Sequence, residues 1–103
     1  MRKLQWRITG YDRGTPIFEM KVAFGQLSER KIMQLLKTLV AKAGLTDSEI
    51  VGAYAKRGTK LANHLLDVQK DSSQATYICG SNRYFVANVM DNSGTIVRYP
   101  RLS

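Results

Sequence analysis

The spacing of hydrophobic residues changes twice along this 103-residue chain, and this change constrains the fold more than any other feature. Residues 3 to 11 and 18 to 24 alternate apolar and polar side chains, as half-buried strands do. Residues 28 to 43 instead repeat apolar side chains at helical spacing. Strand-like segments return after residue 67. The order strands, helices, strands predicts one α+β domain over residues 1–103, with the helices packed on one face of the sheet.

The first two strand-like runs predict a β-hairpin. The segment Asp12-Arg13-Gly14 separates them, and its glycine suits a turn with positive φ. The second run has a stripe of four apolar residues, which we expect the following helix to cover: Phe18, Met20, Val22 and Phe24. Ser28 can cap that helix and Gly44 can end it. Its expected buried face consists of Ile32, Leu36, Leu39, Val40 and Ala43.

A second helix is marked by the clearest local signal in the chain. Thr46 and Glu49 have the spacing of a capping box. We expect this helix to run to about Lys56, to bury Ile50, Val51 and Tyr54, and to end at Gly58. Thr59 is then expected to cap a third, short helix that contains Leu61 and Leu65 and can extend to Leu66.

The last third of the chain predicts an antiparallel β-meander. Turn-forming residues separate the segments with strand character. The expected strands are Val68 to Lys70, Ala75 to Cys79, Tyr84 to Met90 and Thr95 to Tyr99.

Charge is the unusual part of the composition. Sixteen Lys and Arg residues face eight Asp and Glu residues, which gives a formal net charge of +8. Such a balance attracts polyanions, either nucleic acid or an acidic protein surface. The single cysteine, Cys79, excludes an internal disulfide and favours a reducing, cytoplasmic location. No apolar run has the length of a membrane span, so we expect no membrane partner, and a homodimer is an open possibility.

Residues with catalytic chemistry are few and scattered. His64 and Asp67 are spaced for an acid–base pair on one helical face, but no nucleophile is adjacent in sequence. Cys79 ends an expected strand and is interpreted as a buried, inert thiol. One Cys and one His cannot supply four soft metal ligands. The sequence therefore predicts a non-enzymatic protein without a metal or cofactor.

Cations gather in two places, and both are candidate contacts for a polyanion. The segment AKRGTK brings Lys56, Arg57 and Lys60 around one glycine. The outer surface of the first helix adds Arg30, Lys31, Lys37 and Lys42. Arg83 and Arg98 are secondary candidates because each precedes an aromatic residue, as in surfaces that stack unpaired bases.

Two functions are compatible with this pattern. The first hypothesis is a small nucleic-acid-binding module that contacts mainly the phosphate backbone. The alternative is a protein-binding accessory factor, such as an inhibitor, adaptor or regulator, that docks on an acidic partner. A phage or plasmid origin is compatible with the second hypothesis.

Overall fold

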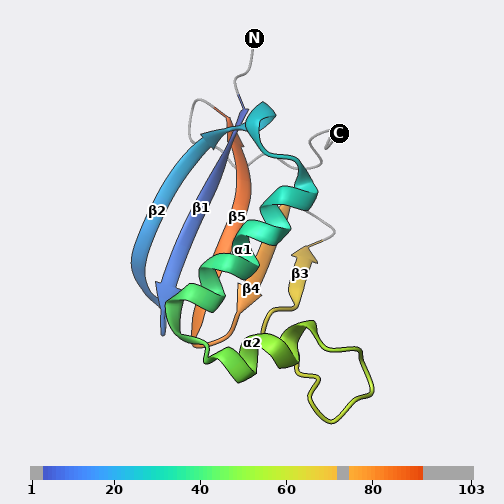
Figure 1. Cartoon of the computed structure of the whole chain (residues 1–103). Helices are drawn as coiled ribbons and strands as arrows, with labels where there is room; N and C mark the ends of the chain where they lie inside the picture. Colours follow the sequence, from blue (N-terminus) through green and yellow to red (C-terminus); the bar gives the residue numbers. More distant parts are fainter. Residues whose placement is uncertain (1–3, 72–74, 92–103) are drawn as a thin grey trace.

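The computed structural model describes residues 4–71 and 75–91, which form a five-stranded antiparallel sheet with helices on one face (Figure 1). The strand order is β2-β1-β5-β4-β3. The helices are α1 (Glu29–Gly44) and α2 (Asp47–Tyr54), and a short 3-10 helix, η1 (Phe24–Gln26), precedes α1. The strands are β1 (Leu4–Asp12), β2 (Thr15–Ala23), β3 (Val68–Asp71), β4 (Thr76–Gly80) and β5 (Arg83–Asp91). This arrangement confirms the predicted α+β fold.

The predicted hairpin is β1 and β2. Arg13 and Gly14 both have positive φ, 52° and 86°, which is the backbone of a type I′ two-residue turn. The Arg13 backbone N–H donates to the Asn82 carbonyl oxygen at 2.7 Å. The β1–β2 hairpin is thereby joined to the β4–β5 turn at one end of the sheet.

The core lies between α1 and the middle of the sheet. Ile32, Leu36 and Val40 are buried, as the helical spacing predicted, and they face β5 and β4. Trp6 is fully buried beside them, and its ring lies 5.4 Å from Phe24. Its indole N–H donates to the Leu27 carbonyl oxygen at 3.0 Å. Trp6 therefore has two roles. It fills part of the core, and it holds the segment that connects the hairpin to α1 in place.

The prediction that α1 covers the apolar stripe of β2 was wrong for its central residues. Figure 1 shows α1 crossing in front of β5 and β4, and Phe18 and Met20 on β2 are 37% and 54% exposed. The reason is topological. β5 pairs with the free edge of β1, so the centre of the sheet shifts away from the hairpin. β2 then becomes an edge strand.

The second helix starts as predicted. The Thr46 backbone N–H donates to the Glu49 carboxylate at 2.9 Å, and the Glu49 backbone N–H donates to the Thr46 hydroxyl at 3.2 Å. This capping box is complete. The helix ends at Tyr54, two residues before the expected end.

The third short helix does not form. Residues 55–67 make a series of turns, with Gly58 at a φ of 88°. Asn63 binds back to α2, and Leu66 is buried in the core. Because these two residues tie the segment to its surroundings, the chain cannot coil into a helix of its own.

The meander is confirmed over its first three strands. β4 pairs with both β3 and β5, and each pair is antiparallel. Gly80 begins the turn between β4 and β5, and its φ of 101° is one that glycine adopts readily. The expected strand at Thr95–Tyr99 lies outside the described residues.

A polar cluster joins the start of α1 to the far half of the sheet. The Tyr77 hydroxyl donates to the Glu29 carboxylate at 2.7 Å, and the Lys70 ammonium donates to the same oxygen at 3.0 Å. These hydrogen bonds, from Tyr77 first and then Lys70, lower the pKa of Glu29. Burial, and then the hydrogen bond to Glu29, raise the pKa of Tyr77.

This cluster predicts an acid-sensitive contribution to stability. Folded Glu29 releases its proton more readily than unfolded Glu29, so its contribution is present above the ordinary pKa of 4.5 and is lost as pH falls through the folded-state pKa. Replacing Glu29→Gln should lower the unfolding free energy at pH 7 by about 1 kcal/mol, and the difference from wild type should shrink at pH 3. Urea titrations followed by Trp6 fluorescence at both pH values measure this.

The charge-matched control is Glu19→Gln, because Glu19 is exposed on β2. At protein concentrations at which the chain is monomeric, Glu19→Gln should leave the pH dependence of stability unchanged. An equal loss for Glu29→Gln at pH 7 and pH 3 would contradict an ionic role for this carboxylate.

Candidate functional site

The loop that follows α2 is fixed to the helix by one asparagine. The Asn63 side-chain amide donates to the Glu49 carbonyl oxygen at 3.0 Å, and its backbone N–H donates to the Gly52 carbonyl oxygen at 3.1 Å. Gly52 is buried, and a Cβ there would collide with the Leu61 carbonyl oxygen and the Asn63 amide. The loop therefore packs directly on the helix backbone. An isolated glycine inside a helical pattern was the sequence signal for this close approach.

The cations of the loop do not have equal freedom. The Arg57 guanidinium donates two hydrogen bonds to the Asp67 carboxylate, at 3.0 and 3.1 Å. It also lies 2.6 Å from Nδ1 of His64. Hydrogen bonds from His64 and then Arg57 hold the pKa of Asp67 below its ordinary value. Arg57 is thus paired with Asp67 although its side chain is 67% exposed, and Lys56 and Lys60 are exposed as well.

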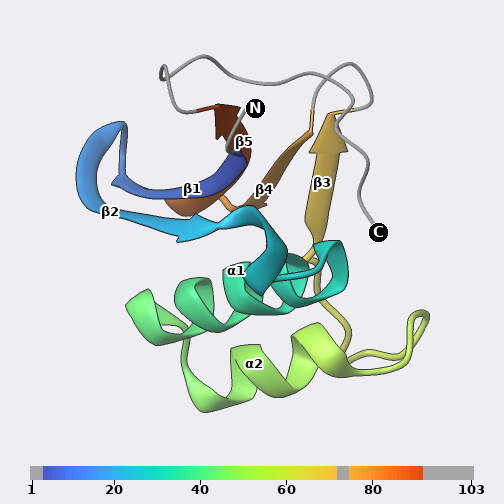
Figure 2. The same ribbon diagram turned by 90° about the horizontal axis from the view of Figure 1, so that it is seen from above.

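The cations of α1 lie on two separate lines along the helix. Arg30 and Lys37 are seven residues apart and share one line, while Lys31 and Lys42 share another, about 100° further round. The first line meets α2, because the Lys37 ammonium lies 5.8 Å from the centre of the Tyr54 ring. This contact brings Lys37 to the end of α2. Figure 2 shows α2 beside α1, on the side of α1 away from the sheet.

Three large apolar side chains are exposed around this contact. Val51, Tyr54 and Leu61 have exposed fractions of 59%, 66% and 68%. They lie on α2 and on the loop segment that packs against Gly52. We define the Tyr54 surface as these three residues together with the cations of the first line of α1 and two exposed cations of the loop: Val51, Tyr54, Leu61, Arg30, Lys37, Lys56 and Lys60.

The secondary candidates have different surroundings. The Arg83 guanidinium donates to the Ala43 carbonyl oxygen at the end of α1 and lies 3.5 Å from the Asp12 carboxylate. Its neighbour Tyr84 stacks on Tyr11 with ring centres 5.0 Å apart. Arg83 therefore caps a helix, which sequence spacing did not reveal. Arg98 lies outside the described residues.

Of the residues considered for catalysis, His64 and Asp67 line one pocket, and Cys79 is not among the residues that line it. Nδ1 of His64 lies 2.8 Å from Asp67, but the His64 side chain is 74% exposed. Cys79 is buried, and burial raises the pKa of its thiol to about 11. Residues 4–71 and 75–91 contain no group of three or more His, Cys, Asp or Glu placed to hold a metal ion.

Comparisons with protein-family models, curated proteins and solved structures found no match for this chain. Neither helix in the described part of the chain combines the length and the apolar composition that crossing a bilayer requires. The Tyr54 surface is therefore interpreted from its own geometry.

Because the loop packs on Gly52, we predict that replacing this glycine by alanine changes the free energy of unfolding in the direction opposite to the usual one. Alanine in a helix interior ordinarily stabilises a protein by about 1 kcal/mol relative to glycine. Here Gly52→Ala should destabilise the protein by about 1–3 kcal/mol, because the new Cβ meets backbone and amide atoms of the loop. Chemical denaturation measures the change.

Gly25→Ala is the matched control. A Cβ at Gly25 meets no atom within 4 Å, so this variant should be close to neutral. A stabilising effect of Gly52→Ala would contradict the described packing of the loop on α2.

Proposed function

We propose that the protein is a non-enzymatic binding module for single-stranded nucleic acid and that the Tyr54 surface is its contact site. The observation on which this rests is the Lys37–Tyr54 contact. It places one cation of α1 against an exposed aromatic ring that lies two residues before Lys56 in the chain. Rings flanked by cations bind single strands because each ring stacks on a base while the cations meet the phosphates.

The charges around Tyr54 support a backbone-directed mode of binding. Arg30, Lys56 and Lys60 are exposed, and Lys37 is half-buried beside the ring. Each cation that meets a phosphate releases counterions, which gives affinity without sequence preference. Arg57 contributes little in this proposal, because Asp67 already binds it. Lys31 and Lys42 lie on a different side of α1 and would contribute only at longer range.

Double-stranded DNA is a poorer ligand for this surface. Base-edge reading by a helix needs polar side chains near its N-terminus that can approach phosphates. The first turn of α2 contains Asp47 and Glu49 instead. An exposed ring such as Tyr54 needs an unstacked base.

The test is fluorescence anisotropy with labelled single- and double-stranded oligonucleotides over a salt series. Four phosphate contacts predict a log–log salt slope of about −3 for a single strand. Tyr54→Ala should weaken single-strand binding by about 5- to 150-fold, since stacking contributes about 1–3 kcal/mol per base. Lys60→Gln should reduce the magnitude of the slope by about 0.7.

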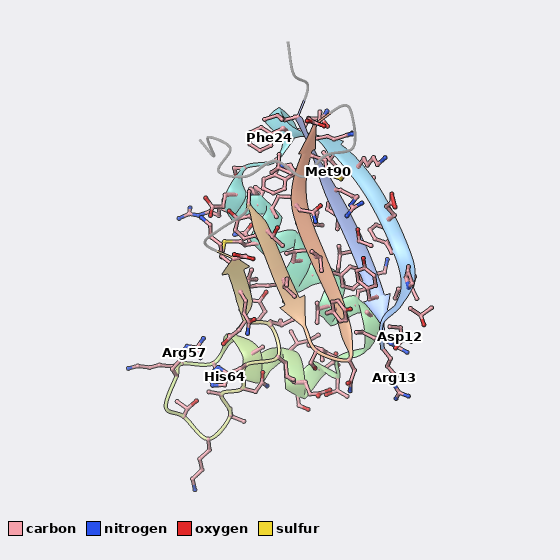
Figure 3. The ribbon with its side chains drawn as sticks, turned by 180° about the vertical axis from the view of Figure 1, so that it is seen from behind. Asp12, Arg13, Phe24, Arg57, His64 and Met90 are labelled. Carbon is pink, nitrogen blue, oxygen red and sulfur yellow. The ribbon has the colours of Figure 1, made fainter. Side chains whose placement is uncertain are left out.

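Arg13→Gln is the charge-matched control. Arg13 is exposed at the hairpin tip, far from Arg57 and its loop in Figure 3. Its replacement should leave the slope unchanged. Equal effects of Lys60→Gln and Arg13→Gln would mean that only net charge matters and would contradict the proposed site. Weak binding that vanishes at physiological salt would contradict the function itself.

A second candidate function is docking on an acidic protein partner. Val51 and Leu61 favour it, because exposed aliphatic side chains rimmed by cations are typical of protein interfaces. Under this alternative, Val51→Ser/Leu61→Ser abolishes binding to a nuclease-resistant protein partner while oligonucleotide binding is weak in every variant. Under the nucleic-acid proposal, Tyr54→Ala has the larger effect.

A further inference from the structure

The outer edge of β2 is open and partly apolar. All nine residues of β2 are exposed except Val22, which is half-buried. Within residues 4–71 and 75–91, β2 pairs only with β1. Long exposed edge strands present unpaired N–H and C=O groups that another strand can pair with. At the opposite edge of the sheet, β3 has only four residues.

The apolar side chains of β2 are placed where a further strand would cover them. Phe18 and Met20 pair with Gly10 and Ile8 of β1, and so they lie on the face of the sheet that α1 covers elsewhere. α1 packs over β5 and β4 and leaves these two side chains partly in water. A strand added beside β2 would bury part of this surface with its own side chains.

Two copies of this chain can pair through β2 in only a few registers. A two-fold axis perpendicular to the sheet makes the two strands antiparallel and keeps each side chain on its original face. Directly opposed residues must then lie on the same face, so the axis passes beside one residue, which faces its own copy. The regular part of β2 runs from Phe18 to Ala23. An axis at Val22 or Ala23 would leave Glu19 and Lys21 without a charged partner, so the residues to compare are Phe18, Glu19, Met20 and Lys21.

The charges of β2 select one of these registers. An axis at Glu19 or at Lys21 would place like charges opposite each other, which is destabilising. An axis at Phe18 leaves both charges without an opposite partner. An axis at Met20 places Glu19 of each copy opposite Lys21 of the other, and Phe18 opposite Val22. This register alone satisfies both charges and aligns the apolar residues.

We infer that the protein forms a homodimer by antiparallel pairing of β2 with β2 of a second copy, centred on Met20. The two sheets then become continuous. A two-fold axis perpendicular to the sheet relates each face of one sheet to the same face of the other. The α1 helices of both copies therefore lie on the same side of the joined sheet. This inference goes beyond the proposed function, since it uses a different surface and does not depend on what the Tyr54 surface binds.

Sedimentation equilibrium of the full chain tests the pairing through its charges. Glu19→Lys and Lys21→Glu each place like charges opposite each other twice, so each variant alone should dimerise about tenfold more weakly or worse than wild type. An equimolar mixture of the two variants should recover the dimer, because every opposed pair is again Lys with Glu. The double variant Glu19→Lys/Lys21→Glu should also dimerise like wild type.

A cysteine variant tests the register. Opposed residues in an antiparallel pair have Cα atoms about 4.5–5.5 Å apart, which suits a disulfide. Met20→Cys should therefore cross-link two copies rapidly on mild oxidation. In the control Ala23→Cys, the two thiols would be about 20 Å apart, and cross-linking should be slow. The native Cys79 is buried and does not compete.

Three results would overturn the inference: a wild-type chain that stays monomeric, single charge variants that dimerise as well as wild type, or equal cross-linking of Met20→Cys and Ala23→Cys. Oligonucleotide titrations of the monomeric charge variants separate the two proposals. Per-protomer binding that is retained in these variants shows that the Tyr54 surface acts independently of dimer formation.

Discussion

The packing of the Trp6 indole is the contact on which the rest of this structure depends. Trp6 lies on β1, which pairs with β2 on one side and β5 on the other. Its ring contacts Phe24 and Tyr77, and its N–H binds the Leu27 carbonyl oxygen. One side chain thus joins both halves of the sheet to the entry of α1. Once that entry is fixed, the buried stripe of α1 can lie only across β5 and β4.

The Tyr54 surface follows from this placement of α1. With Ile32, Leu36 and Val40 against the sheet, the line that contains Arg30 and Lys37 turns toward α2. The capping box fixes the start of α2, and the Asn63 hydrogen bonds hold the loop against it. The chain therefore presents Tyr54 and Leu61 to solvent without a helix to cover them. The same placement leaves the edge of β2 uncovered.

Local features were predictable from the sequence because their causes are local. The hairpin turn at Arg13-Gly14, the buried face of α1 and the capping box each depend on residues within a few positions. The third helix was predicted wrongly because long-range contacts, through Asn63 and Leu66, decide the path of that segment. Whether α1 covers the apolar stripe of β2 depends on the strand order of the sheet. The alternation of apolar and polar residues does not specify that order.

In the candidate site too, individual residues were predictable from the sequence, but their long-range contacts were not. Lys37, Lys56 and Lys60 were singled out from charge alone, but the contact of Lys37 with Tyr54 depends on how α2 folds back beside α1. Arg57 was grouped with Lys56 and Lys60, and Arg83 was a secondary candidate, yet Asp67, Asp12 and the Ala43 carbonyl engage these two arginines in the fold. Val51 and Tyr54 were expected to be buried by the second helix, and this prediction was wrong, because their side chains are 59% and 66% exposed.

Chemical-shift mapping with isotopically labelled protein and an unlabelled single-stranded oligonucleotide tests the central claim most directly. The account predicts that saturable shifts gather in residues 51–61 and in the turn of α1 around Lys37. Shifts confined to the strands around Arg7 and Asn88, which face away from α1, or no shifts at saturating oligonucleotide, would contradict it.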